Sequence, residues 1–456
     1  MKKYIFLASA IVLIYFLQSF FLAAGGIGAD SLSYFGIASD LPEIETNLFP
    51  LGFPVLLKMY HFIFGDYFWA GKMINISFVI IILIFSYVKK FYFKETVLLF
   101  TGKTLFFAFN IVSSEGLFIF LLYFLLYIFH ERFTDKINSE LFLIFATVLM
   151  IAMFTVRYSG IYIYLGIAIF YFIMLMRRKV FSFKGDFFKF LVISGLGILA
   201  YLLFNYSGFG SLTGEHLRGA PAEYHLIYIV RDFLGVTNVI DPFIGLKPSS
   251  NSFTSLAFQV GIMVVDLILL FYLIKLYRRK KGVIHREFHY FIWTLAGVYT
   301  VTLFVSGYFQ QIEEMNVRML AAANFCLFFS FLIIYYKNLE SDALIFRTGC
   351  FFLFFLMAYS LKSPANYLKN KAVIAAQMPQ FESKKYLFDD EQHQSVITTY
   401  KIPLLEKSFK YQHTNSQAGV IKQSISGTIN PQIKWLKYDT IADKSTVLYT
   451  SQLILK

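Results

Sequence analysis

The feature that most limits the fold of this chain is a succession of long apolar runs separated by short polar segments. About 20 apolar residues are enough for a helix to cross a bilayer core of ~30 Å. Hydrophobic residues make up 57% of the 456 residues, whereas an ordinary soluble domain has roughly 45–50%. The sequence therefore predicts an all-α polytopic membrane protein with about eleven transmembrane helices. The expected spans are the N-terminal run as far as Ala24, and then 67–88, 96–111, 116–130, 138–156, 159–176, 187–206, 253–277, 288–308, 317–336 and 346–361.

The first run follows Lys2 and Lys3 and is too long for the apolar region of a signal peptide, so we expect an uncleaved first span. Cys326 and Cys350 both lie in apolar runs and predict no disulfide framework.

The distribution of basic residues predicts the orientation of the chain in the membrane. The net charge is +13, but the basic residues occupy every second short loop, which argues against nucleic-acid binding. This alternation follows the positive-inside rule. It places the N-terminus in the cytoplasm and the C-terminus outside a cell inner (plasma) membrane. The basic loops contain Lys2 and Lys3; Lys89, Lys90 and Lys94; Arg132 and Lys136; Arg177, Arg178 and Lys179; Arg278, Arg279, Lys280, Lys281 and Arg286; Lys337 and Arg347.

Two regions are expected, a transmembrane domain over 1–361 and an extracytoplasmic tail or small domain over 362–456. The tail is polar, and its alternating segments Ser395 to Tyr400 and Thr446 to Leu455 are typical of strands.

The loop between the first two spans predicts a helix lying on the membrane surface. Pro54 suits the first position of this helix, and Gly65 suits the position just after its end. Lys58 and His61 are three residues apart and share one face, while apolar residues cover the other. The acid Asp30 comes earlier in the same loop.

Several ionisable residues lie at span ends on the side opposite the basic loops. Charges at membrane depth are costly and commonly mark a functional site, so we expect them to line one pocket. The alternative is that each one simply meets water at the interface. No Walker motif, Rossmann glycine fingerprint or zinc-type cluster is present, which argues against an ATP-driven pump. The residues are Asp30, Glu115, Arg157, Glu313, Glu314 and Arg318.

Four motifs give the chain a resemblance to the GT-C class of membrane glycosyltransferases, which includes protein O-mannosyltransferases and the lipid A aminoarabinose transferase. The first is an acid and a tyrosine, Asp30 and Tyr34, followed by Phe49-Pro50-Leu51-Gly52-Phe53-Pro54. The second and third are Ser114-Glu115-Gly116 and Thr155-Val156-Arg157-Tyr158-Ser159-Gly160, and the fourth is Arg318 in Asn316-Val317-Arg318. The second aspartate that some members carry in an outer loop has no match.

The resemblance implies an inverting hexosyl- or pentosyltransferase that uses a polyprenyl-phosphate sugar as donor. Asp30 would be the general base and Glu115 a second catalytic carboxylate. Arg157 and Arg318 would bind the donor phosphate. No cofactor is implied, and a divalent metal is left open. The partners are membrane lipids, the donor, and a glycan, lipid or protein acceptor. The substrate-binding residues would be Tyr34, Lys58, His61, Tyr158, Glu313 and Glu314.

Two other functions fit a polytopic chain with a large outer loop. One is an envelope polysaccharide polymerase. The other is a transporter or lipid flippase, for which inverted repeats and broken helices near mid-membrane are expected.

Overall fold

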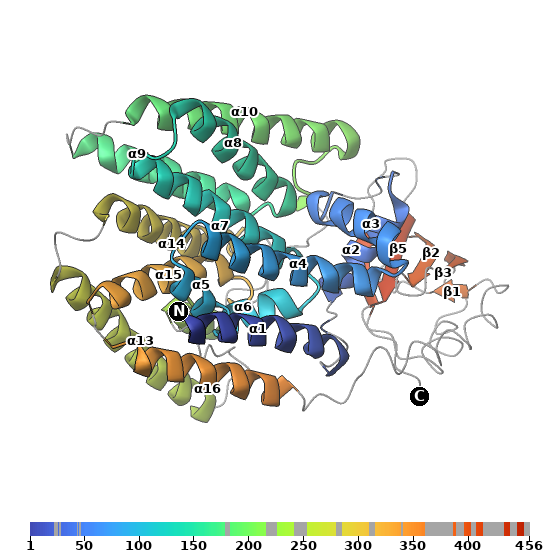
Figure 1. Cartoon of the computed structure of the whole chain (residues 1–456). Helices are drawn as coiled ribbons and strands as arrows, with labels where there is room; N and C mark the ends of the chain where they lie inside the picture. The colour runs from blue at the N-terminus through green and yellow to red at the C-terminus, as the bar shows by residue number, and fades with distance from the viewer. Residues whose placement is uncertain are drawn as a thin grey trace.

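The computed structural model describes residues 1–21, 26, 29–42, 44, 47–177, 183–215, 226–240, 253–279, 285–309, 315–338 and 341–360, together with five strands between 386 and 450. Its helices run side by side in several layers, with α8, α9 and α10 on one side and α13 and α16 on the other (Figure 1). The helix α7 packs on α8, and α14 packs on both α9 and α15. The predicted fold class, an all-α polytopic membrane protein, is confirmed.

Eight helices in the described residues are long and apolar enough to cross a membrane. Their ends agree with the predicted spans to within a few residues. They are α1 Lys2–Phe21, α4 Tyr67–Val88, α7 Ser114–Phe133, α8 Ser139–Val156, α10 Lys184–Phe209, α13 Phe253–Arg279, α14 Arg286–Ser306 and α16 Ala343–Ser360.

Two further predicted spans are also helices. The helix α9, Gly160–Met176, is shorter and very apolar. The helix α15, Ala321–Asn338, is buried along most of its length in the interior of the bundle. It begins later than predicted because residues 317–320 form a turn.

The expected single span over 96–111 is wrong. Two short helices occupy this stretch, α5 Phe93–Leu99 and α6 Lys103–Asn110. Gly102 adopts an extended conformation before α6. Within the break, the Phe100 carbonyl accepts a hydrogen bond of 2.7 Å from the Tyr15 hydroxyl of α1. The Phe100 carbonyl, which has no partner in either short helix, is therefore hydrogen-bonded inside the protein. A broken helix is tolerated within a membrane only when its free backbone groups are satisfied in this way.

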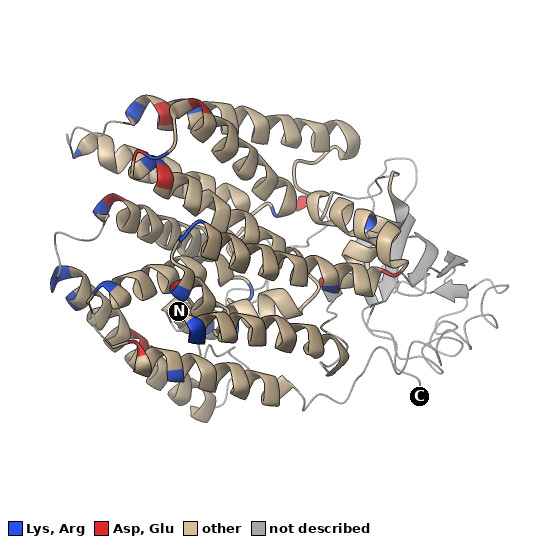
Figure 2. Ribbon diagram, viewed as in Figure 1, with Lys and Arg blue, Asp and Glu red and all other residues tan. Residues whose placement is uncertain are grey.

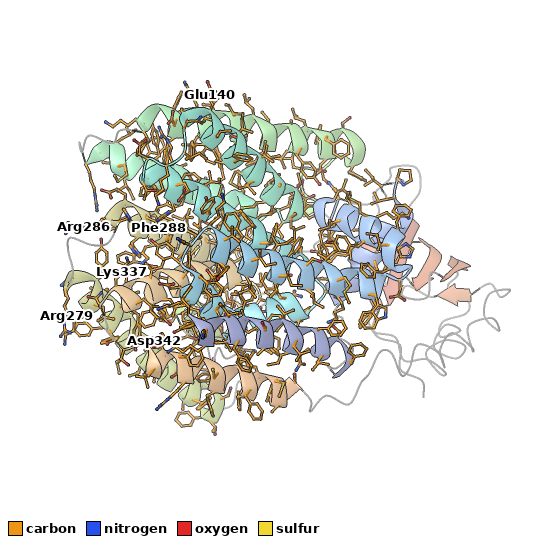
Figure 3. The ribbon with its side chains drawn as sticks, in the orientation of Figure 1. Glu140, Arg279, Arg286, Phe288, Lys337 and Asp342 are labelled. Carbon is orange, nitrogen blue, oxygen red and sulfur yellow. The ribbon has the colours of Figure 1, made fainter. Side chains whose placement is uncertain are left out.

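The bundle has two chemically different ends. Lys and Arg residues gather at one of them, where α4, α7 and α9 end and α14 begins (Figure 2). Arg279, Arg286 and Lys337 all lie towards this end, which we call the basic end (Figure 3). The short helices α2, Ala29–Asp40, and α3, Gly52–Phe64, lie at the opposite end.

Helix α3 has the composition of a membrane-surface helix. Its exposed side chains include Val55, Met59, Phe62 and Ile63, all apolar. It begins at Gly52, two residues before the predicted start at Pro54, and it ends as predicted, with Gly65 in the left-handed region at φ 65°. This apolar exposure agrees with the predicted surface helix. Two further short helices follow α10, namely α11 Leu226–Gly235 and α12 Thr237–Ile240.

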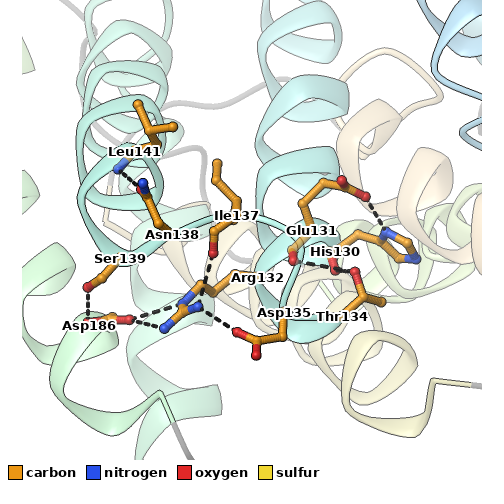
Figure 4. Close-up of polar contacts among 10 residues, drawn as sticks. All are labelled: His130, Glu131, Arg132, Thr134, Asp135, Ile137, Asn138, Ser139, Leu141 and Asp186. Atoms are coloured by element: carbon orange, nitrogen blue, oxygen red, sulfur yellow. Dashed lines mark hydrogen bonds and ion pairs between the residues drawn. The ribbon is translucent and has the colours of Figure 1, made fainter.

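A polar network at the basic end holds the α7–α8 turn against α10 (Figure 4). The Arg132 guanidinium contacts Asp186 at 2.6 Å and also donates to the Ile137 carbonyl. Asp186 accepts a hydrogen bond from Ser139, and the Asn138 side chain caps α8. Because this network joins three helices at one level, the basic loop has a defined structure.

The tail contains a five-stranded sheet with the strand order β1-β3-β2-β5-β4. The strands β2 and β5 fall on the two segments predicted as strands. Strand β5 lies against α2. The bounds are β1 Tyr386–Phe388, β2 Val396–Ile402, β3 Lys407–His413, β4 Ile433–Lys437 and β5 Ser445–Thr450.

Candidate active site

Glu115 lies at the centre of the candidate site, in the first turn of α7. An acid is favourable there because the N-terminus of a helix carries a partial positive charge. Its carboxylate contacts Arg157 Nη1 at 2.6 Å and Arg318 Nε at 3.2 Å. The Glu115 side chain is only 4% exposed. A carboxylate so enclosed requires charged partners, and the two arginines supply them.

Arg157 reaches the site from the connection between α8 and α9. Its backbone is extended, which ends α8 and directs the side chain towards α7. Besides Glu115, its Nη1 donates to the Ser114 hydroxyl at 3.3 Å. Burial acts to lower the pKa of Arg157, but Glu115, Tyr299 and Tyr34 together outweigh it and raise the pKa. Arg157 is therefore a permanent cation.

Arg318 forms ion pairs with both acids of the site, Glu115 and Asp30. It lies in the turn before α15, where the Asn316 side chain accepts hydrogen bonds from the backbone N–H groups of Arg318 and Met319. Its Nη2 is 2.8 Å from Asp30 Oδ2, in the first turn of α2. These side chains are more open than Glu115, with 25% of Arg318 and 22% of Asp30 exposed.

The structure thus brings four of the predicted residues into one row, in the order Asp30, Arg318, Glu115 and Arg157. They come from four segments far apart in the sequence. Two negative and two positive charges alternate along the row, so the ionised groups compensate one another. Glu115 is the least exposed member of the row at 4%, whereas Arg157, Arg318 and Asp30 are 21%, 25% and 22% exposed.

Tyr34, one helical turn after Asp30, connects α2 to the row. Its hydroxyl is 2.8 Å from the Ser114 hydroxyl, and its ring meets Phe49 and Phe53 edge-on. Burial raises the pKa of Tyr34, so the phenol stays neutral. Its position fixes α2 beside the start of α7.

Three of the other predicted substrate-binding residues, Tyr158, His61 and Lys58, are among the described residues. The Tyr158 hydroxyl donates to the Asn47 carbonyl at 2.6 Å and accepts from the Asn205 side chain at 2.9 Å. His61 stacks on Tyr67 at 4.1 Å between ring centroids. Lys58 lies on α3, partly exposed. Glu313 and Glu314 lie outside the described residues.

Sequence reasoning did not single out Ser114 or Tyr299. Ser114 contacts both Arg157 and Tyr34. Tyr299 of α14 donates to the hydroxyl of Ser159, two residues after Arg157, at 3.3 Å. Ser114 could have been predicted because it adjoins Glu115 in the sequence. Tyr299 lies inside an apolar run, where no neighbouring residue marks it as part of a site.

Among the described residues, no group of three or more His, Cys, Asp or Glu side chains has a geometry that could hold a metal ion. The acids of the row are instead paired with arginines.

The helices and their arrangement define a polytopic membrane protein with the fold of the GT-C glycosyltransferases. The crystal structure of ArnT from Cupriavidus metallidurans bound to undecaprenyl phosphate is similar over 98% of this chain and 98% of that chain. The TM-score is 0.56 and the sequence identity is 10%, so the likeness concerns the fold. No family model matches the sequence, and no curated protein matches it.

Proposed function

We propose that this chain is an integral-membrane glycosyltransferase that moves a sugar from a polyprenyl-phosphate donor to an acceptor hydroxyl. The observation that carries the proposal is the row of alternating charges from Asp30 to Arg157 at one end of the bundle. The fold supports it, because the similar ArnT structure holds undecaprenyl phosphate.

The donor phosphate is assigned to Arg157 and Arg318. A guanidinium offers a rigid fork of N–H donors that matches phosphate oxygens. The helix α15, which begins three residues after Arg318, also lines an apolar cavity of about 310 Å³ between α13 and α16. Leu327, about 9 Å along α15 from its first residue by the rise per residue, is one of the lining residues. A single helix therefore connects a phosphate site to a place for an isoprenoid tail.

Exposure separates the roles of the two acids. Asp30, at 22% exposed, is open enough to meet an acceptor hydroxyl, whereas Glu115, at 4% exposed, is enclosed by its arginines. Asp30 is therefore the proposed general base. Glu115 holds the two guanidinium groups in place for the donor.

The reaction is a single displacement with inversion. The acceptor oxygen forms a bond to the anomeric carbon, and the bond from this carbon to the phosphate oxygen breaks. The acceptor proton passes to Asp30, and the polyprenyl phosphate leaves with the electron pair. Protonation of Asp30 weakens its pairing with Arg318, so this guanidinium becomes available as charge develops on the leaving phosphate. The proposal assigns no step to a metal.

The same proposal places the site on the extracytoplasmic face. The basic end suits the cytoplasm by the positive-inside rule, and Asp30 of the charge row lies in the first turn of α2, which is at the opposite end (Figure 1). An alkaline phosphatase fusion after Ser360 should be active. An inactive phosphatase, with an active cytoplasmic reporter at the same position, would reverse the orientation.

The test of function uses the full-length chain in nanodiscs. Undecaprenyl phosphate should raise its melting temperature, and undecaprenol, which lacks the phosphate, should not. Undecaprenyl-phosphate sugars labelled in the sugar should then release undecaprenyl phosphate when an envelope extract supplies the acceptor. No stabilisation and no release would refute the proposal, and movement of intact donor across the bilayer without release would indicate a flippase.

A further inference from the structure

The turn from Asn110 to Ser113 directly precedes α7 and so determines where Glu115 lies relative to the two arginines. It begins with the last residue of α6 and ends just before the first residue of α7. The last carbonyl groups of a helix have no partner within it, and extended residues beyond it have none either. The carbonyls of Asn110, Ile111 and Val112 therefore need donors from elsewhere.

Side chains of two other helices provide those donors. Lys72 of α4 donates to the Asn110 carbonyl at 2.5 Å, and Asn75 of α4 donates to the Ile111 carbonyl at 2.9 Å. Being three residues apart, Lys72 and Asn75 share one face of α4. Ser31 of α2 donates to the Val112 carbonyl at 2.5 Å. Three consecutive carbonyls are thus held by three side chains.

The direction of the Lys72 side chain is unusual. Lys72 lies near the start of α4, where a lysine ordinarily extends its ammonium to the membrane surface. Here the residue is only 2% exposed, and its ammonium points to the C-terminus of α6. A cation at that end of a helix is favourable.

Close packing leaves the turn little freedom to shift. A Cβ atom on Gly71, which precedes Lys72, would lie 2.3 Å from Val112 Cγ1. A Cβ atom on Gly26, whose φ is +72°, would lie 2.2 Å from the Asn110 carbonyl oxygen. The Gly26 carbonyl also accepts a hydrogen bond from the Val112 N–H at 2.9 Å.

We propose that Lys72 is a positioning residue that, with Asn75 and Ser31, fixes the turn before α7 and so sets Glu115 between Arg157 and Arg318. This inference rests on the proposed function for its kinetic test. Lys72 does not touch the substrates. It acts through Glu115, which holds Arg157 and Arg318 for the donor phosphate, and a displacement of about 1 Å of groups at the reacting centre can cost 10²-fold in rate.

The variant Lys72→Met keeps the length of the side chain and removes the donor and the charge. We expect kcat to fall about 10- to 100-fold, with the KM for the donor unchanged and the protein still folded. Lys94→Met, at the basic end of α5, is the matched control and should keep the wild-type kcat.

A double-mutant cycle separates positioning from simple structural support. If Lys72 acts through Glu115, adding Lys72→Met to Glu115→Gln should cause little further loss, because residues in one network are not additive. Equal losses in both backgrounds would overturn the proposal. Ser31→Ala is a milder second variant, and it should lower kcat in the same way if Lys72→Met fails to fold.

Amide hydrogen exchange provides a readout that needs no activity. The segment 110–116 should exchange faster in Lys72→Met than in the wild type, while segments at the basic end should not change. If the wild type transfers no sugar but the segment 110–116 exchanges faster in Lys72→Met, the proposed function is refuted, while the role of Lys72 in fixing the turn is supported. Unchanged exchange together with a wild-type kcat would refute the role of Lys72.

Discussion

Replacing Asp30 with Asn tests the proposed general base with the smallest change of shape. The amide of Asn has nearly the volume of the carboxylate, and it cannot accept a proton near neutral pH. Asp30 lies inside the first turn of α2, so it is not the residue that caps this helix. The substitution therefore removes one charge and one base while leaving the backbone conformation in place.

The expected loss of activity is much larger than the expected loss of stability. Asp30 and Arg318 are 2.8 Å apart, but 22% and 25% of their side chains are exposed. Such a partly exposed pair contributes on the order of 1 kcal/mol or less, and the helix N-terminus adds about 0.3–1 kcal/mol. Loss of a general base lowers the rate by typically 10²–10⁴-fold, which corresponds to about 3–5 kcal/mol in activation free energy.

The assay compares purified wild-type and Asp30→Asn protein in nanodiscs, with an undecaprenyl-phosphate sugar as donor and an envelope extract as acceptor. Release of undecaprenyl phosphate gives the rate, and the melting temperature is measured in parallel. We expect nearly equal melting temperatures and a rate lower by at least about 100-fold. Activity within a few-fold of the wild type would eliminate Asp30 as the base and transfer that role to Glu115.

Three further predictions concern the rest of the bundle. Glu115→Gln should destabilise the protein by about 3 kcal/mol, the lower end of the range for a buried pair that loses one partner, measured by unfolding in mixed detergent. Tyr158→Phe should lower the free energy of unfolding by about 1–3 kcal/mol through its lost hydrogen bonds, with the donor KM unchanged; a raised KM would support substrate binding instead. The hydrogen bond from Lys3 holds the pKa of Asp342 below its ordinary value, so its stabilisation is present above the unfolded pKa and is lost as pH falls through the folded one. Asp342→Asn should therefore melt earlier than the wild type at pH 7, and the two should converge in acid.

Most of the fold was accessible from the sequence because hydrophobicity alone decides which segments cross a bilayer. The ends of α4 coincide with the predicted span 67–88. The break between α5 and α6 was missed because Thr101 and Gly102 interrupt the apolar pattern too little to reveal it. The hydrogen bond that satisfies the Phe100 carbonyl within the break comes from the Tyr15 hydroxyl, on a helix distant in the sequence.

The site was accessible only in part. Placing charges at span ends predicts that they meet, because each would be costly without a partner. The pairing order depends on how α2, α7 and α15 pack, which no local pattern encodes. A neighbour in the sequence need not share the contacts of a site residue. Tyr158 follows Arg157 in the chain, but its hydroxyl contacts Asn47 and Asn205.

The two short helices α5 and α6 together cross the membrane once, as the predicted single span would have done. The helices α5 and α6 have 7 and 8 residues, which together give about 22 Å of helix at 1.5 Å per residue, and the three residues between them lengthen the path towards the ~30 Å of a bilayer core. The chain therefore leaves α4 at the basic end and returns to the opposite end before α7 begins. If α5 and α6 instead formed a shallow hairpin, α7 would begin at the basic end, and Glu115 would lie about a membrane thickness from Asp30. Arg318 contacts both acids within 3.2 Å, which is possible only because the two short helices together complete the crossing.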